Sequence, residues 1–202
     1  MDITLGVIKM TLKRTSGGSK EKSTTFVNMP EGEYEGRLVY VADLGLQHRS
    51  FSGEEKPDAY QIALGIEILG HTVEFDGVEK PRLMWTKGFN IFNVMNEKGA
   101  EYKYYKVFNP KAEEGQVADW EKVLGEPCSV TVKHRQGKGE YADSVFDEIG
   151  SVSPIPAKYK ASVPEAILTP CIGDCEDEDN DATKALYGLV KWIHSRRVNA
   201  PF

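Results

Sequence analysis

Hydrophobic and polar residues alternate along much of the stretch from 33 to 152, and this two-residue period is typical of half-buried β-strands. The alternation is clearest over residues 33–45 and again over residues 60–69. In the second segment Ile62, Leu64 and Ile66 share one face, which is therefore apolar. Residues 48–58 are polar and contain glycine and proline, so they predict a loop between the two strands.

Weaker patterns predict further strands and one helix. Residues 83–92 form a third strand rich in aromatic side chains, and residues 101–108 either extend it or form a separate crossing element. Residues 119–125 begin at a good N-cap and end at a glycine, so they predict a short helix. Residues 128–134 are rich in β-branched side chains, and residues 141–149 return as the last strand after turn residues at 136–139.

The predicted order is three strands, a short helix and a two-stranded hairpin, which is the order of the OB fold. We therefore expect a mainly β protein, with a five-stranded OB-type barrel and one short helix between strands 3 and 4. A C-terminal extension with a helix completes the expected fold. An SH3-like barrel and an irregular sandwich are the alternatives.

The segments on either side of the expected barrel differ from it in composition. Residues 1–29 hold an alternating start and a flexible basic loop, and residues 30–155 form the expected OB-fold domain. Residues 156–202 hold an extended proline-containing segment, expected to lie over the barrel, followed by an acidic block and a helix. This helix is predicted over 181–193, where apolar residues recur at helical spacing and basic residues follow the end.

The formal net charge is −6, but the charge is unevenly distributed. Six acidic residues lie within eight positions, and the rest of the chain is formally neutral without them. A neutral body can carry a basic groove, so the net charge does not exclude a nucleic-acid partner. The acidic block consists of Asp174, Glu176, Asp177, Glu178, Asp179 and Asp181.

Two aromatic stretches also contain lysines, a combination typical of proteins that bind single-stranded nucleic acid. Bases stack on the aromatic faces, while the cations follow the phosphates. The alternative is that these aromatics are core residues, and in a strand one of the adjacent Tyr104 and Tyr105 would point inward. The candidates are Trp85, Lys87, Phe89 and Phe92 in the first stretch, and Tyr102, Lys103, Tyr104, Tyr105 and Lys106 in the second.

A second concentration of basic residues lies at the predicted hairpin between the last two strands. In an OB fold the loop that joins these strands borders the binding face. A charged hairpin tip can equally be a solvated turn. The candidates are Lys133, Arg135, Lys138 and Tyr141 at the hairpin, together with Arg37 and Tyr40 on the first strand.

No pattern in the sequence favours catalysis. There is no P-loop, no G-x-G-x-x-G and no G-x-S-x-G sequence. Cys171 and Cys175 lack the further ligands of a structural zinc site, and the acidic block lacks the spacing of an EF-hand loop. We therefore expect a protein that is not an enzyme, with no catalytic residues, no metal and no cofactor.

Three segments share a recognisable pattern of glycines, strands and aromatics. They read PEGEY at 30–34 leading into RLVYVADLG at 37–45, LGEPC at 124–128 followed by VTVKH at 130–134, and GKGEY at 137–141. This pattern resembles bacteriophage single-stranded DNA-binding proteins with an OB fold. The resemblance implies a protein without catalytic activity that coats DNA strands in replication, recombination and repair, alongside replication or recombination enzymes.

Proteins of this kind commonly end in an acidic tail with a terminal aromatic residue. Here Phe202 is terminal, but Arg196 and Arg197 precede it and the acidic block lies earlier in the chain. The block is therefore either a solvated loop and helix start, or a regulatory segment that occupies the basic groove when DNA is absent.

We expect single-stranded DNA as the partner, a cytoplasmic location (that of the host if the protein is phage-encoded), and an exposed strand that permits a homodimer. No apolar run approaches the ~20 residues that a bilayer requires. The start of the chain has no secretory signal, and an odd number of cysteines suits a reducing compartment. The alternative is an OB-type protein-interaction module of a phage assembly or replication complex, and a small hydrolase or nucleotide-binding enzyme comes third.

Overall fold

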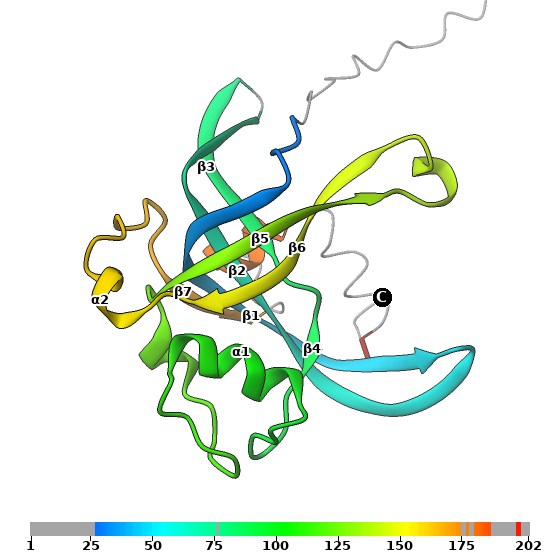
Figure 1. Cartoon of the computed structure of the whole chain (residues 1–202). Helices are drawn as coiled ribbons and strands as arrows, with labels where there is room; N and C mark the ends of the chain where they lie inside the picture. The colour runs from blue at the N-terminus through cyan, green and yellow to red at the C-terminus, as the bar shows by residue number, and fades with distance from the viewer. Residues whose placement is uncertain (1–26, 76, 175–176, 178–179, 187–196, 199–202) are drawn as a thin grey trace, which may run out of the picture.

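One long antiparallel hairpin, formed by β1 (Gly32–Phe51) and β2 (Glu54–Phe75), runs through the protein. The structure is a computed structural model that describes residues 27–75, 77–174, 177, 180–186 and 197–198. These residues form one sheet in the order β3-β2-β1-β5-β6, while β4 pairs with β2 and β7 pairs with β1. The expected mainly β class is confirmed (Figure 1).

The other elements follow the predicted positions to different degrees. The strands predicted over 33–45, 60–69 and 128–134 lie within β1, β2 and β5, and the helix predicted over 119–125 contains the 3-10 turn η1. The remaining strands are β3 (Val78–Trp85), β4 (Phe89–Asn90), β5 (Pro127–Gln136), β6 (Val145–Pro154) and β7 (Cys171–Asp174). The helices are α1 (Ala100–Phe108), α2 (Ala157–Lys160) and α3 (Asp181–Ala185), with 3-10 turns η1 (Trp120–Val123) and η2 (Gly139–Tyr141).

The sheet is open and has seven strands, whereas the sequence predicted a partly open OB-type barrel of five strands. β3 and β6 are the two ends of the sheet, and no strand ladder joins them among the described residues. Residues 27–31 bridge the two ends instead: Val27 accepts a hydrogen bond from Arg82 of β3, and Met29 donates one to Asp147 of β6. The two ends are also joined directly by the ion pair between Arg82 and Asp147.

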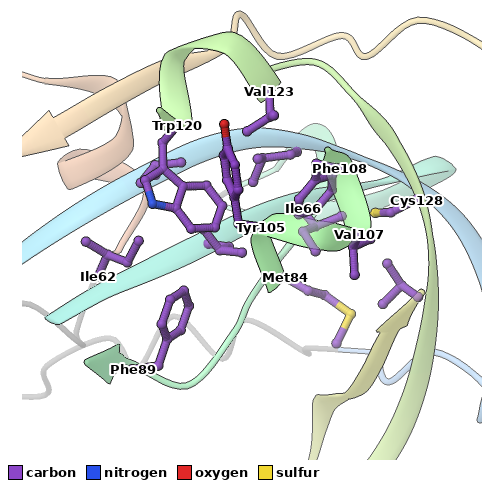
Figure 2. Close-up of a cluster of buried hydrophobic side chains, with 14 of the residues drawn as sticks. Ile62, Ile66, Met84, Phe89, Tyr105, Val107, Phe108, Trp120, Val123 and Cys128 are labelled. Atoms are coloured by element: carbon purple, nitrogen blue, oxygen red, sulfur yellow. The ribbon is translucent and has the colours of Figure 1, made fainter. Parts of the chain in front are cut away.

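The main hydrophobic core lies between the inner face of the sheet and the segment that holds α1 and η1 (Figure 2). The apolar face predicted for residues 60–69 contributes its centre, where Leu64 and Ile66 have no exposed surface. Tyr105 of α1 meets Trp120 of η1 edge to face, with ring centroids 5.2 Å apart. Burial of these side chains provides the main driving force for folding.

Residues 101–108 lie in helix α1, so they form a separate element and do not extend the third strand, which was the other expectation. The buried Glu101, Tyr105 and Phe108 are four and three positions apart, so they lie on one helical face. Tyr102 and Lys106 lie one turn apart, and the Lys106 ammonium donates to the Tyr102 hydroxyl at 2.7 Å. Aromatic residues favour strands in general, but here packing of the helical face against the sheet decides the element.

The predicted loop at 48–58 is instead the outer arm of the β1–β2 hairpin. Strand pairing continues to Phe51 opposite Glu54, and Ser52 and Gly53 form the turn. Both turn residues have positive φ, 52° and 81°, as tight hairpin turns require. Most side chains of this arm are exposed, so their polarity is compatible with a strand that extends beyond the core.

The outer face of β1, β2 and β3 is covered by the chain that follows β6. β7 pairs in parallel with β1 from Tyr40 to Asp43. α3 is capped by Asn180, whose side chain accepts a hydrogen bond from the Ala182 amide at 2.8 Å. The buried residues of this face include Val39, Ala42, Leu44, Ala63, Ala182 and Leu186. The predicted continuation of the helix to residue 193 and the basic loop at 11–26 lie outside the described residues.

Candidate nucleic-acid interface

Four of the side chains expected to contact nucleic acid are buried. Arg37, Tyr40, Phe89 and Tyr105 are between 4% and 8% exposed. Phe89 and Tyr105 belong to the main core, and the Arg37 guanidinium is held by three backbone carbonyl oxygens. None of the four offers a surface to a base or a phosphate, so direct contact with nucleic acid does not fit their positions.

Tyr40 and Trp85 stack on each other on the covered outer face, with ring centroids 6.1 Å apart and planes at 23°. The Trp85 indole donates to the Ala185 carbonyl oxygen of α3 at 3.4 Å. Gly65 leaves room for this pair, because an added Cβ would lie 2.9 Å from Tyr40 and 3.1 Å from Trp85. In OB folds the face of strands 2 and 3 binds oligonucleotides, but here α3 and residues 166–168 pack against the face that carries Tyr40 and Trp85.

α1 carries the second aromatic and lysine stretch, and only part of it is accessible. Tyr104 stacks on Phe89 with centroids 4.9 Å apart, and burial raises the pKa of the Tyr104 hydroxyl. Tyr102 is half-buried beside Lys106. The exposed candidates of this region are Phe92, Lys103 and Lys106. The region therefore offers cations and one exposed ring. It lacks the surface of interleaved aromatic and basic side chains that a strand at these residues would have presented.

The β5–β6 hairpin brings accessible candidates together on one face. Lys133 and Arg135 are two positions apart on β5, so their side chains share a face. Glu148 lies directly opposite Lys133 on β6, and Phe146 lies opposite Arg135. The Arg135 guanidinium carbon lies 5.4 Å from the centre of the Phe146 ring, a cation–π distance. We call these four residues the outer hairpin face.

The tip of this hairpin adds an exposed aromatic ring. Tyr141 of η2 is 62% exposed and meets Phe146 edge to face, with centroids 6.2 Å apart. Gly137 permits this arrangement, because an added Cβ would collide with the Tyr141 carbonyl oxygen. Lys138 is exposed beside it. The tip therefore presents a ring and cations next to the outer hairpin face.

Lys87 joins the outer hairpin face from the link between β3 and β4. Its ammonium lies 3.3 Å from Glu148 Oε2, and Arg135 Nε lies 3.3 Å from the same oxygen. The aliphatic part of Lys133 lies against Gly150, where an added Cβ would come within 2.8 Å of it. Lys87 and Arg135 are 79% and 48% exposed, so both cations remain accessible to a ligand.

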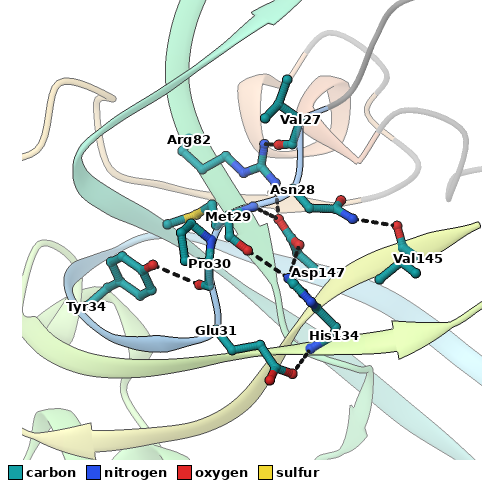
Figure 3. Close-up of polar contacts among 10 residues, drawn as sticks. All are labelled: Val27, Asn28, Met29, Pro30, Glu31, Tyr34, Arg82, His134, Val145 and Asp147. Atoms are coloured by element: carbon teal, nitrogen blue, oxygen red, sulfur yellow. Dashed lines mark hydrogen bonds and ion pairs between the residues drawn. The ribbon is translucent and has the colours of Figure 1, made fainter.

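The inner face of the same hairpin has a structural role (Figure 3). His134 and Asp147 lie opposite each other, and Asp147 accepts from the Arg82 guanidinium and from the Met29 amide. His134 Nε2 lies 2.7 Å from the Met29 carbonyl oxygen and 3.5 Å from Asp147 Oδ1. Arg82 and Asp147 are each 3% exposed. The two-residue period therefore separates this Arg82–Asp147 cluster from the accessible outer face.

Two aromatic residues near these hairpins, Phe146 and Tyr60, were not predicted from the sequence. Phe146 belongs to the site because it faces Arg135. The alternation of residues would have placed Phe146 on this face if the turn had been predicted at 137–144. Tyr60 is 58% exposed on β2, next to an arm that carries Arg49 and Lys56. The β1–β2 and β5–β6 hairpins project toward the same side in Figure 1.

The acidic block forms no ligand site within the part of the chain that the structure describes. Asp174 ends β7, Asp181 begins α3, and both are exposed, as is Asp177. No group of three or more His, Cys, Asp or Glu side chains that could hold a metal ion occurs among the described residues. The residues Glu176, Glu178, Asp179 and Cys175 lie outside them.

No protein-family model matches this chain, and no curated protein matches it. None of the helices in the described ranges is long and apolar enough to cross a membrane. Function is therefore inferred from the geometry of the site.

Proposed function

We propose that this protein binds single-stranded DNA, without chemistry on it, through an open OB-type barrel. The strand order β3-β2-β1-β5-β6, with α1 and η1 before β5, supports the OB assignment. In OB folds the loop between the last two strands contacts the nucleic acid. The β5–β6 hairpin is the corresponding element here.

The observation that carries this proposal is the composition of the outer hairpin face and tip. Lys87, Lys133 and Arg135 are exposed cations, and Tyr141 is an exposed ring in contact with Phe146. Bases that stack on such rings contribute about 1–3 kcal/mol each, irrespective of sequence. Coating of strands during phage-type replication, recombination and repair, together with partner enzymes, is the role that this binding would serve.

The test is fluorescence anisotropy of a labelled oligo-dT, and of a duplex of equal length, at several salt concentrations. We expect tighter binding to the single strand, with log K falling by about 0.7 per contacted phosphate for each unit of log salt. Intrinsic tryptophan fluorescence is a weaker reporter, because Trp85 packs under α3. Absence of binding to oligo-dT would overturn the proposal and favour the protein-interaction module.

A matched pair of tyrosines locates the site. Tyr141→Ala should weaken binding to oligo-dT about fivefold or more, in line with the loss of one stacked base. Tyr159→Ala is the control, since Tyr159 is 52% exposed and has the Lys158 ammonium 4.6 Å from its ring centre, but lies on α2. Equal effects of the two substitutions would place the site elsewhere.

A further inference from the structure

One oxygen of Glu148 is shared by two cations from distant parts of the chain. Oε2 lies 3.3 Å from Lys87 Nζ and 3.3 Å from Arg135 Nε. This oxygen is buried, yet it receives no hydrogen bond of good geometry. Lys133 is its opposite neighbour across the two strands. The carboxylate is therefore held by the charges of Lys87 and Arg135.

An anionic oxygen between a lysine and an arginine is the arrangement that a DNA phosphate would require at this place. Phosphates and carboxylates present the same kind of acceptor to these cations. The neighbouring rings, Phe146 beside Arg135 and Tyr141 beside Phe146, are within reach of a base attached to such a phosphate. Phosphate and stacking positions thus adjoin on one surface.

We propose that the Glu148 carboxylate occupies a phosphate subsite in the unbound protein, and that a DNA phosphate displaces it when the strand binds. This inference rests on the proposed function. Glu148 keeps Lys87 and Arg135 close together without DNA, and it competes with the phosphate for them. It therefore sets the affinity of the site and the steepness of its salt dependence.

Displacement of Glu148 is physically inexpensive. Although Oε2 is covered, its partners Lys87 and Arg135 are 79% and 48% exposed, and ion pairs to such exposed cations contribute only about 0–1 kcal/mol each. A phosphate that replaces the carboxylate interacts with both cations. If the carboxylate stayed in place, it would repel the incoming phosphate, because both groups are anions. At about 6 Å in a watery surrounding, that repulsion corresponds to roughly a threefold loss of affinity, and to more where the local dielectric is lower.

The test compares oligo-dT affinity of wild type, Glu148→Gln and the control Glu121→Gln, which removes one exposed charge from η1. Glu148→Gln keeps the shape of the side chain, and thermal unfolding checks that the fold is intact. We expect it to bind oligo-dT about threefold to tenfold more tightly at low salt, with the gain shrinking as salt screens the charge. The control should change affinity much less.

A second comparison separates local competition from a general charge effect. In a Lys87→Gln, Arg135→Gln background there are no cations to release, so Glu148→Gln should gain no more than the control does. A gain of full size in that background would overturn the inference, as would equal affinities of Glu148→Gln and Glu121→Gln in the native background. Failure of the proposed function is a different result, because wild-type protein would then not bind oligo-dT at all.

Discussion

Arg37 of β1 and Glu67 of β2 lie directly opposite each other in the sheet, and both bind the backbone of residues 163–168. Arg37 donates to two carbonyl oxygens of this segment at 2.6 and 2.8 Å. Glu67 accepts from two of its amide groups at 2.8 to 3.1 Å. A buried cation thus binds carbonyl groups and a buried anion binds amides, so the segment is docked through its backbone.

The Glu67 carboxylate should be important for this docking. Glu67→Gln replaces one acceptor oxygen by an NH₂ group that faces the amide donors of residues 167 and 168. We expect the free energy of unfolding to fall by about 2 kcal/mol, because hydrogen bonds to charged groups contribute about 1.5–3 kcal/mol. Urea unfolding measures the loss, and faster tryptic cleavage at Lys158 or Lys160 reports release of the segment. Glu74→Gln, at an exposed position of β2, is the control and should leave both unchanged.

The Arg82–Asp147 pair should be strongly coupled, since it joins the two ends of the open sheet. Asp147→Asn keeps an acceptor for the Met29 amide but removes the carboxylate that pairs with the buried Arg82 guanidinium, and breaking a buried ion pair costs about 3–5 kcal/mol. In an Arg82→Met background the same substitution should cost much less. Urea unfolding of the four proteins gives the coupling energy, and additivity within about 0.5 kcal/mol would show that the pair does not act as a unit.

Glu101 predicts a pH dependence of stability. It is 5% exposed, and desolvation by burial raises its pKa above the ordinary value of 4.5, against a hydrogen bond from the Phe92 amide. The folded protein therefore holds this proton more tightly than the unfolded chain. The resulting stability is fully present below pH 4.5 and is lost as pH rises through the raised pKa.

Glu101→Gln should remove that loss, because the amide cannot ionise. Unfolding curves in urea at a series of pH values should show the variant gaining stability relative to wild type as pH increases above 4.5. A stability difference that is constant with pH, or that shrinks, would contradict the assignment.

The cysteines should differ sharply in reactivity. Cys128 has no exposed surface, and burial raises the pKa of its thiol to about 12. The thiolate is the reactive form, so native protein near pH 8 should leave Cys128 unmodified by iodoacetamide. Cys171 is partly exposed and should react faster, although burial raises its pKa as well. Peptide mapping by mass spectrometry distinguishes the two, and rapid native labelling of Cys128 would contradict its buried position.

The alternation of apolar and polar residues was sufficient to predict the middle of β1 and β2, and the β-branched residues at 128–134 predicted the middle of β5. One face of each strand is buried against the core, and a two-residue period is the direct consequence. Helix α1 was missed, although Glu101, Tyr105 and Phe108 already have helical spacing. Because Glu101 is a charged residue, these positions were not recognised as the apolar face of a helix. The adjacent aromatic residues favoured a strand instead.

The composition of the sequence and its two-residue alternation of apolar and polar residues were enough to determine a mainly β protein with a cationic hairpin near residue 135. Only the tertiary structure decided which aromatic rings are available. Tyr40, Phe89 and Tyr105 are buried because α1 and the segment after β6 cover the two faces of the sheet, and this covering depends on contacts between residues far apart in sequence. The same long-range contacts place Lys87 beside Glu148 and Arg135. Sequence periodicity reports which side of a strand faces inward, whereas the partner on that side is set by the packing of the whole chain.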